Sequence, residues 1–538
     1  MVEAHGGVLA AEVLKQHGVD TVFTLSGGHL FVFYDGFVQR DIRIVDVRHE
    51  QTAAFAAEGW AKVTRRPGVA ALTAGPGVTN GISAMGSAWF TGSPMLVLGG
   101  RAPQGRWGAG SLQEIDHLPL VAPITKRAVT AFSGEELVKE LHESLLAART
   151  PHRAPVFLDV PLDGFGTVDV EIPPGPTPAE VAGADPDPDD VATVARLLSE
   201  AERPVLFAGA DVYWGFAEGP LVELAEALSV PVFTNGMGRG TIPADHDLAF
   251  SRVRALALKE ADLVVVAGTP LDFRLRFGDF GGAKVVHLVD AADQLGTHAD
   301  LAASVVGNLA ATLSGIAAQG SPKGHGEWVA LLREAETAER AGEREALEAD
   351  ADPIKPSRIY GELTKRLERD AVVIGDGGDF VSYAGKYVDT YEPGCFLDPG
   401  PYGCLGMGPG YALAAKLAHP DRQVVVLYGD GAIGFALSDL DSLVRHQVPV
   451  VMIVGNNGIW GLEKHPMKAI FGYDVAADLR PGTRYDEVMT ALGGHGELVT
   501  DPKEVGPAID RAFAAGGPAL VNVVTDPDDV YPRSANLA

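Results

Sequence analysis

A strand–helix–strand unit between residues 423 and 457 limits the possible folds more than any other stretch of the sequence. Residues 423–428 and 448–454 are short apolar runs rich in β-branched residues, and an amphipathic run with helical spacing separates them. Two strands joined by a helix pair in parallel, so the chain is predicted to contain a parallel sheet of the α/β class. Asp430 follows the first strand and Asn457 the second, so both side chains are expected at the same edge of the sheet.

This edge has the composition of a site for a metal ion and a phosphate group. Asp430 and Asn457 offer a carboxylate and an amide oxygen. These suit Mg²⁺, which takes few protein ligands and completes its shell with water and phosphate oxygens. The glycines beside Asp430 let backbone N–H groups approach a diphosphate closely. For this segment alone, a plain strand–helix–strand unit with a glycine-rich turn is the alternative.

The spacing from Gly-Asp-Gly at 429–431 to the Asn pair at 456–457 resembles the cofactor motif of thiamin-diphosphate enzymes in the acetolactate synthase superfamily. The resemblance covers nearly the whole chain. It implies that Asp430, Asn457 and the backbone carbonyl of Ile459 hold Mg²⁺, which grips the diphosphate of the cofactor. It also places five further residues close to the diphosphate: Gly377, Gly378, Asp379, Gly431 and Ala432.

Two other segments resemble the parts of the family that bend and activate the cofactor. Met407 would sit under the cofactor and force its two rings together, and the carbonyl of Leu405 would accept from the 4′-amino group. Glu50, at the start of a predicted helix, would share a proton with the pyrimidine ring, a role suited to the raised pKa of a partly buried carboxylate. Without the resemblance, Met407 reads as ordinary core and Glu50 as an acid that interacts with the helix dipole.

The substrate is expected to be selected over the thiazolium ring by His29, Gln113, Glu463, Trp460 and the tail. His29 and Gln113 resemble positions used in benzaldehyde lyase and hydroxyacyl-CoA lyases, and Glu463 falls where decarboxylases of the superfamily place an acid. A histidine beside a reacting alcohol can shuttle a proton. A turn histidine that caps a helix is the alternative for His29.

The leading hypothesis is a 2-hydroxyacyl-CoA lyase, which cleaves a 2-hydroxyacyl-CoA to an aldehyde or ketone plus formyl-CoA and catalyses the reverse condensation. The alternative is an acetolactate-synthase-like enzyme that decarboxylates a 2-oxo acid and joins the product to an acceptor. Against this alternative, Ser111-Leu112 precedes Gln113 where the synthases usually carry an aromatic residue, and no Gln-Gly-Met run follows Asn457. A non-catalytic regulatory subunit is disfavoured by the intact Glu50 and Asp430.

The chain is too long for one hydrophobic core. Three doubly wound parallel-sheet domains are predicted: a pyrimidine-binding domain (1–170), a central nucleotide-binding-like domain (188–322) and a diphosphate-binding domain (353–525). The first and third are expected to be structurally alike, as the superfamily implies. The tail, 526–538, resembles a segment that closes over the active site.

The central segment Gly268–Gly278 resembles the nucleotide-carrying middle domain of oxalyl-CoA decarboxylase and 2-hydroxyacyl-CoA lyase. By this resemblance Arg274 or Arg276 would meet a diphosphate and Asp290 a ribose or adenine. ADP is the expected occupant, and FAD, as in acetolactate synthase, is the competing one. The charged stretch 325–350 is predicted to be a solvated inter-domain helix.

The bulk composition restricts the partners. A net charge of −28 and a pI near 4.9 argue against nucleic-acid binding. The chain is predicted to be cytoplasmic and not to bind membranes. It has only two cysteines, no signal-peptide pattern and no apolar run of membrane-spanning length. In the family the cofactor lies between the first domain of one subunit and the third domain of another. The expected state is therefore at least a homodimer, and a homotetramer is favoured, with a small-molecule substrate such as an acyl-CoA.

Overall fold

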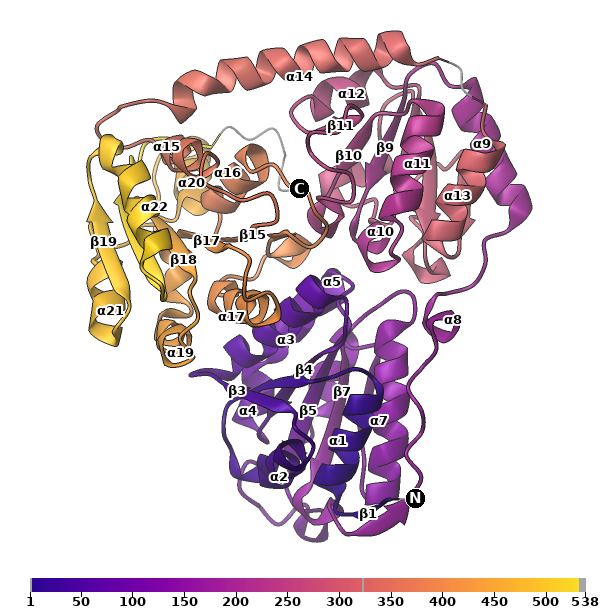
Figure 1. The fold of residues 1–538 in the computed structure, drawn as a ribbon, viewed down its shortest axis with the longest axis vertical. Helices are drawn as coiled ribbons and strands as arrows, with labels where there is room; N and C mark the ends of the chain where they lie inside the picture. Colours follow the sequence, from indigo (N-terminus) through magenta and orange to yellow (C-terminus); the bar gives the residue numbers. More distant parts are fainter. Residues whose placement is uncertain (1, 322–323, 532–538) are drawn as a thin grey trace.

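The chain folds into three α/β domains, each built around a parallel sheet of six strands, and the predicted fold class is confirmed (Figure 1). The structure is a computed structural model that describes residues 2–321 and 324–531. The inner strands of each sheet are largely apolar because helices cover both faces of the sheet. In the central domain, for example, every residue of Leu263–Ala267 is buried. Some edge strands carry charged or polar residues, as in Arg43–Asp46, Arg127–Thr130 and His495–Val499.

The N-terminal sheet has the order β3 (Arg43–Asp46), β2 (Thr21–Thr24), β4 (Gly68–Leu72), β5 (Met95–Arg101), β7 (Val156–Pro161) and β6 (Arg127–Thr130). Its helices are α1 (Gly6–Gln16), α2 (Phe31–Gln39), α3 (Glu50–Thr64), α4 (Pro76–Asn80), α5 (Ile82–Phe90), α6 (Leu118–Val121) and α7 (Gly134–Arg149). A short antiparallel pair, β1 (Val2–Ala4) and β8 (Val168–Val170), lies beside this sheet.

The C-terminal sheet repeats this topology. Its order is β16 (Phe396–Leu397), β15 (Val372–Asp376), β17 (Val424–Gly429), β18 (Val451–Asn456), β20 (Ala519–Val524) and β19 (His495–Val499). Its helices are α15 (Pro356–Leu363), α16 (Asp379–Tyr387), α17 (Gly408–Ala418), α18 (Asp430–Gly434), α19 (Leu440–Arg445), α20 (Gly461–Phe471), α21 (Tyr485–Leu492) and α22 (Val505–Ala514). In both sheets the second strand along the chain lies at one edge and the fifth at the other, so the two domains are alike, as predicted.

The central sheet has the strand order typical of dinucleotide-binding domains, 3-2-1-4-5-6 counted within the domain. The strands are β11 (Ala249–Phe250), β10 (Val232–Thr234), β9 (Pro204–Ala208), β12 (Leu263–Ala267), β13 (Lys284–Val289) and β14 (Ala303–Val306). The helices are α9 (Pro188–Glu200), α10 (Ala210–Trp214), α11 (Glu218–Leu228), α12 (Arg254–Glu260) and α13 (Leu309–Gln319), and α8 (Pro178–Val181) lies in the preceding linker.

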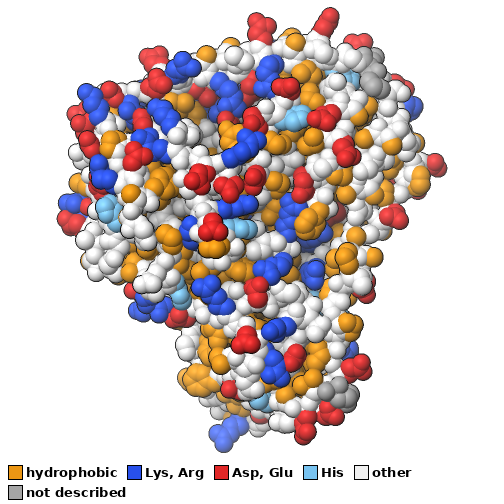
Figure 2. Space-filling view, in the orientation of Figure 1, with side chains coloured by type: hydrophobic (Ala, Val, Ile, Leu, Met, Phe, Trp, Pro, Cys, Tyr) orange, Lys and Arg blue, Asp and Glu red, His pale blue; other side chains and the backbone are white. Residues whose placement is uncertain are grey.

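The largest apolar core is shared between the first and third domains, where α3 packs beside α17 (Figure 1). Small residues allow the close approach of the two backbones. A Cβ on Gly410 would lie 2.8 Å from the carbonyl oxygen of Thr52, and one on Gly59 would lie 2.9 Å from Cα of Tyr411. On the face in Figure 2, acidic and basic side chains are interspersed. None of the described helices is long and apolar enough to cross a membrane.

The long helix α14 (Gly326–Leu347) connects the central and C-terminal domains. The prediction of a solvated helix is correct for its outer face and wrong for its inner face. Trp328 and Leu332 are buried against the central domain. The carboxylate of Glu336 is also buried and accepts backbone N–H groups from Ser251, Arg252 and Val253 at 2.8–3.3 Å.

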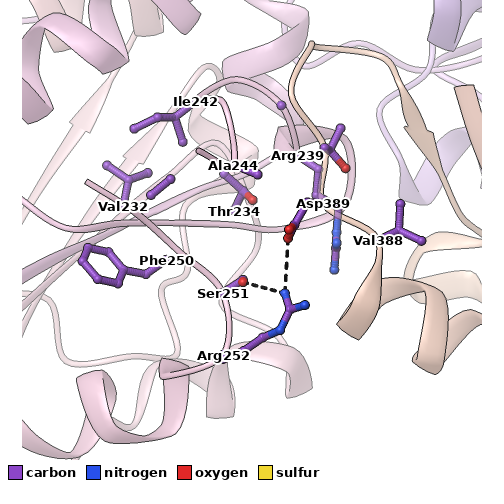
Figure 3. Close-up of a pocket in the computed structure, with 13 residues that line it drawn as sticks. Val232, Thr234, Arg239, Ile242, Ala244, Phe250, Ser251, Arg252, Val388 and Asp389 are labelled. Carbon is purple, nitrogen blue, oxygen red and sulfur yellow. Dashed lines mark hydrogen bonds and ion pairs between the residues drawn. The ribbon is translucent and has the colours of Figure 1, made fainter. Parts of the chain in front are cut away.

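An ion network continues from α14 to the C-terminal domain. Arg252 lies 3.2 Å from Glu343 of α14 and 3.4 Å from Asp389, which follows α16. Figure 3 shows the Arg252 guanidinium between Ser251 and Asp389 in a small pocket at this junction. Arg340 of α14 also pairs with Asp389, at 2.9 Å. The helix is therefore held to both domains by buried or half-buried charges.

Replacing Glu336 by Gln should lower the free energy of unfolding by about 1–3 kcal/mol. The NH₂ of the amide would replace one carboxylate oxygen and would face backbone N–H donors that it cannot accept. The midpoint of urea unfolding measures this change. Glu339→Gln is the control, because Glu339 lies exposed on the same helix and should change stability by less than about 0.5 kcal/mol. Equal midpoints for the two variants would contradict the assignment.

Candidate functional site

Three neighbouring strands of the C-terminal sheet end at one edge and bring the predicted anchor residues together. β15 pairs with β17, and β17 pairs with β18. Asp376 ends the first of these strands, Asp430 follows the second, and Asn457 follows the third. Helices α16 and α18 begin at this same edge.

Asp430 is buried and lies within hydrogen-bonding distance of the segment that carries the other predicted metal ligands. One of its carboxylate oxygens accepts the N–H of Gly458 at 2.7 Å and the other accepts the N–H of Gly431 at 3.1 Å. Burial raises the pKa of this carboxyl to about 6, against a smaller opposing effect of the backbone bonds. Gly458 lies between Asn457 and Ile459, and the Asn457 amide oxygen accepts the N–H of Ile459 at 3.3 Å. A buried carboxylate beside an amide and a carbonyl fits a divalent cation.

Glycines around this carboxylate stand where no side chain has room. A Cβ on Gly378 would lie 2.6 Å from the Leu462 side chain, and one on Gly431 would lie 2.4 Å from the ring of Trp460. Gly377 has φ +134°, a conformation that favours glycine. A Cβ placed on it would lie 3.0 Å from the backbone nitrogen at 429 and 3.4 Å from Ala432. The predicted phosphate-binding segments therefore contact one another.

Met407 is fully buried in the core shared by the first and third domains and precedes the first residue of α17, so its role as a wedge stays a prediction. The loop around it is held by a residue that the sequence analysis did not single out. Asp376, also fully buried, accepts the N–H of Gly406 at 3.0 Å and that of Gly408 at 2.8 Å. Burial raises the pKa of Asp376 to about 6, and the two backbone bonds oppose this shift. The only available signal was an acid at the end of a strand followed by two glycines.

Glu50 is the first residue of α3, buried at 9% exposure, and its carboxylate accepts Asn80 Nδ2 at 2.9 Å. His49 caps the helix by accepting the N–H of Gln51 at 3.1 Å. The Gln51 side chain donates to the carbonyl of Leu405 at 3.4 Å. The acid and the wedge loop are therefore neighbours within one chain.

His29 and Gln113 both adjoin the segment that follows β4. His29 is buried and its Nδ1 lies 3.2 Å from the Thr73 hydroxyl. Burial lowers the pKa of His29, with a smaller contribution from His117. Gln113 has φ +59°, and a Cβ on Gly75 would lie 3.0 Å from the Gln113 side chain. The same segment leads into α4, which carries the Asn80 that contacts Glu50.

A buried histidine that the sequence analysis missed fixes this segment. Nε2 of His117 accepts the N–H of Gly75 at 2.9 Å, so the ring proton is on Nδ1, which lies 2.8 Å from Asp159. Both side chains are fully buried. Only the folded arrangement shows this role, because 42 residues separate each bonded pair.

Glu463 lies apart from these groups. It is exposed near the start of α20, a helix with no buried residue, and no described hydrogen bond or ion pair joins its carboxylate to His29 or Gln113. Its neighbour Gly461 lies beside the predicted phosphate residue Asp379, since a Cβ on Gly461 would lie 2.4 Å from the Asp379 carboxylate. The geometry thus places α20 next to the cofactor edge and leaves the role of Glu463 a prediction.

In the central domain, two of the three predicted nucleotide residues, Arg274 and Asp290, are engaged within the chain. Arg274 forms a two-pronged ion pair with Asp272, with contacts of 2.7–3.1 Å. Asp290 faces His152 and Arg153 at 3.4 and 3.6 Å. A cavity of about 430 Å³ opens where the three domains meet. Arg274 lines it and Asp290 does not. These contacts do not fit a preformed nucleotide site at these two side chains, and ADP or FAD binding stays a prediction.

The described part of the tail packs on α16. Asp529 accepts a hydrogen bond from the Tyr383 hydroxyl at 2.8 Å, and the ring of Tyr531 packs edge-on against Tyr383 at 4.8 Å. Residues 532–538, on which the predicted lid depends, lie outside the described residues.

Comparisons with known proteins agree with this geometry. Three family models for thiamine pyrophosphate enzymes match the chain: the N-terminal TPP binding domain at residues 4–120, the central domain at 191–316 and the C-terminal TPP binding domain at 376–523. The acetolactate synthase large subunit IlvG of Mycobacterium tuberculosis is 56% identical over 99% of this chain and 98% of its own length.

More distant relatives carry a different name. The 2-hydroxyacyl-CoA lyase 2 of Caenorhabditis elegans is 34% identical over 99% of this chain and 91% of its own length. The human 2-hydroxyacyl-CoA lyase 2 is 33% identical over 93% of this chain and 86% of its own length. The chain belongs to the thiamin-diphosphate-dependent enzymes of the acetolactate synthase superfamily.

Proposed function

We propose that this enzyme is an acetolactate-synthase-like carboligase that decarboxylates a 2-oxo acid and joins the product to an acceptor. The observation that carries the proposal is the 56% identity to an acetolactate synthase over 99% of the chain. It replaces the leading hypothesis of the sequence analysis, because relatives named 2-hydroxyacyl-CoA lyase share only 33–34% identity in the alignments described above. Ser111 and Leu112 stand where synthases usually carry an aromatic residue, which argued against a synthase in the sequence analysis. The 56% identity outweighs that argument.

The cofactor edge of the C-terminal domain fits thiamin diphosphate with Mg²⁺. Bound thiamin diphosphate supplies the electron sink for making and breaking bonds next to a carbonyl. We assign Asp430, Asn457 and the carbonyl of Ile459 to the metal ion. The tight contacts at Gly377 and Gly431 leave no room for a side chain at either position, which keeps the backbone open to the diphosphate.

Glu50 holds and moves a proton at the pyrimidine ring in this proposal. Its carboxylate is buried and is oriented by Asn80, so it points in one direction without a cationic partner in the described hydrogen bonds and ion pairs. A buried, positioned carboxylate exchanges protons efficiently with a weakly basic ring nitrogen. The carbonyl of Leu405 would accept from the amino group of the pyrimidine ring. Within the chain the same carbonyl accepts from the Gln51 side chain at 3.4 Å, which holds the wedge loop beside the start of α3.

Asp376 acts through Met407 and is a positioning residue. Its two oxygens accept the N–H groups on either side of Met407, so the backbone of the wedge cannot rotate without leaving donors unpaired in the core. Met407 would in turn exclude water from the space beneath the cofactor, a role that its apolar side chain suits.

His29 and Gln113 face the substrate in this proposal. The lowered pKa of His29 keeps its imidazole neutral at neutral pH, so the ring can accept or donate a hydrogen bond to a reacting oxygen without adding a charge. Glu463 would contribute a proton from α20.

A dimer or tetramer is proposed as the assembled form. Two apolar side chains of α20, Ile470 and Phe471, are exposed in the single chain and suit contact with another surface.

The second candidate function is the 2-hydroxyacyl-CoA lyase reaction, with an acyl-CoA as substrate. It is retained because the Caenorhabditis elegans lyase matches 99% of the chain, so the similarity is not limited to the cofactor domains.

A pair of assays on the purified enzyme with thiamin diphosphate and Mg²⁺ separates the two candidates. Pyruvate should be consumed with formation of acetolactate, while 2-hydroxyisobutyryl-CoA should release little or no acetone and formyl-CoA. Release of formyl-CoA without consumption of pyruvate would replace the proposal by the second candidate.

Substitution of Glu50 by Gln should lower kcat by about 10²–10⁴-fold, the usual contribution of a positioned acid or base, because the amide cannot exchange the ring proton. Steady-state kinetics at saturating cofactor measure the effect. Glu135→Gln is the control, because Glu135 is an exposed acid in the first turn of α7 and should leave kcat unchanged. Full activity of the Glu50 variant would remove this residue from the mechanism.

Asp376→Asn should weaken cofactor binding by about tenfold or more. The NH₂ of the amide would face the N–H of Gly406 or of Gly408, and the lost hydrogen bond, at a cost of about 1–3 kcal/mol, would loosen the loop that carries Met407. Cofactor titration, followed by activity or by fluorescence quenching, gives the half-saturation concentration. Activity should partly recover at high thiamin diphosphate, unlike that of the Glu50 variant. Asp421→Asn, an exposed change in the same domain, should have no effect.

A further inference from the structure

Three potential metal ligands meet where the N-terminal and central domains touch. His152 lies in the loop before β7, Asp211 lies in α10 after β9, and Asp290 follows β13. One donor atom from each residue lies within 4.8 Å of the other two. No family model or relative described above assigns a metal to these residues, and the group lies in a different domain from Asp430.

The distances from the His152 nitrogen to the two carboxylates fit joint coordination of one metal ion better than direct hydrogen bonds. Nδ1 of His152 lies 3.3 Å from an oxygen of Asp211 and 3.4 Å from an oxygen of Asp290. Charge-assisted hydrogen bonds are about 2.7–2.9 Å long. Ligand atoms around a tetrahedral zinc ion with bonds of about 2.0–2.2 Å lie about 3.3–3.6 Å apart.

The same atoms are buried without hydrogen-bond partners. Asp211 is 4% exposed and Asp290 8% exposed. Among the described residues, Nδ1 of His152, one oxygen of Asp211 and both oxygens of Asp290 find no hydrogen-bond donor or acceptor. Three buried carboxylate oxygens without donors are costly, and a cation between them would remove that cost.

The competing arrangement is a protonated imidazole between the two carboxylates. Burial lowers the pKa of His152, but the charges of Asp211 and Asp290 outweigh it and raise the pKa to about 10. A single N–H on Nδ1 cannot point at two carboxylates at once, and Arg153, the other cation nearby, stays 3.6 Å from Asp290. The protonated ring therefore leaves buried oxygens unpaired that a metal ion would satisfy.

We propose that His152, Asp211 and Asp290 bind one divalent transition-metal ion that joins the N-terminal and central domains. An imidazole nitrogen with two carboxylates favours ions such as Zn²⁺ over Mg²⁺ or Ca²⁺. Arg153 then acts as an outer partner of the Asp290 carboxylate, as is common around metal-bound carboxylates. His152 and Asp211 also line the cavity of about 430 Å³, while the proposed donor atoms themselves are buried.

The test uses the full-length protein, freed of metal by a chelator and kept without thiamin diphosphate. Titration with Zn²⁺ in a calorimeter, in buffer containing Mg²⁺, should show one site per chain. Asp290→Asn should weaken that binding by more than about 100-fold, since loss of an outer-shell partner alone costs 10–100-fold. Asp293→Asn, a change at the wall of the same cavity, and Asp430→Asn should leave it intact.

A second measurement does not depend on the stability of any variant. Co²⁺ added to the metal-free native chain should give the visible absorption of a four- or five-coordinate ion, and Zn²⁺ should displace it. The absence of a Zn²⁺ site in the native chain, or equal Zn²⁺ binding by native and Asp290→Asn proteins, would overturn the proposal. A His152 ring that remains protonated at saturating Zn²⁺ by NMR would do the same.

Discussion

The packing of α3 against α17 is the contact on which the candidate site depends. Helix α3 begins at Glu50, and α17 begins directly after Met407, so the contact between these helices fixes the two residues relative to each other within one chain. In the expected assembly, where each cofactor lies between two subunits, this contact would link the acid of one site to the wedge of the next. Glycine and alanine allow the backbones to touch, and a Cβ on Gly410 would press on the carbonyl of Thr52. Because interiors are close-packed, such a change would shift both helices and not one side chain alone. The chemistry is thus coupled to the shared core of two domains.

Loops at the site are held by buried acceptors as well as by packing. Asp376 accepts two N–H groups from the wedge loop, and His117 accepts one from Gly75, beside Gln113. Releasing such a donor inside a protein costs about 1–3 kcal/mol, so these loops have one preferred conformation. His117 is in turn oriented by Asp159, which makes a second layer behind the residues expected to touch the substrate. Rigid placement of this kind is what positioned acid–base chemistry requires.

The sequence was sufficient to predict features that depend on local order along the chain. The βαβ pattern predicted the α/β class and the meeting of Asp430 with Asn457, because parallel strands end at the same edge. It could not reveal Asp376 or His117 as supports, since their partners lie 30–42 residues away and depend on the fold. The inner face of α14 was missed for the same reason: Glu336 finds its donors 83–85 residues away. Substrate choice was the least predictable, because a few side chains over a common cofactor decide it.

The central domain has the strand order of dinucleotide-binding domains, and side chains of another domain reach into its crevice. Its order reverses between β9 and β12, and in such sheets ligands bind in the crevice beside that reversal. In this protein the crevice receives His152 and Arg153 from the N-terminal domain, which approach Asp211 and Asp290. Asp290, which was expected to meet a nucleotide, is thus engaged by another domain together with Asp211. A dinucleotide at this edge would have to displace or share those contacts, whereas a single cation at Nδ1 of His152 would displace only the proton of that ring.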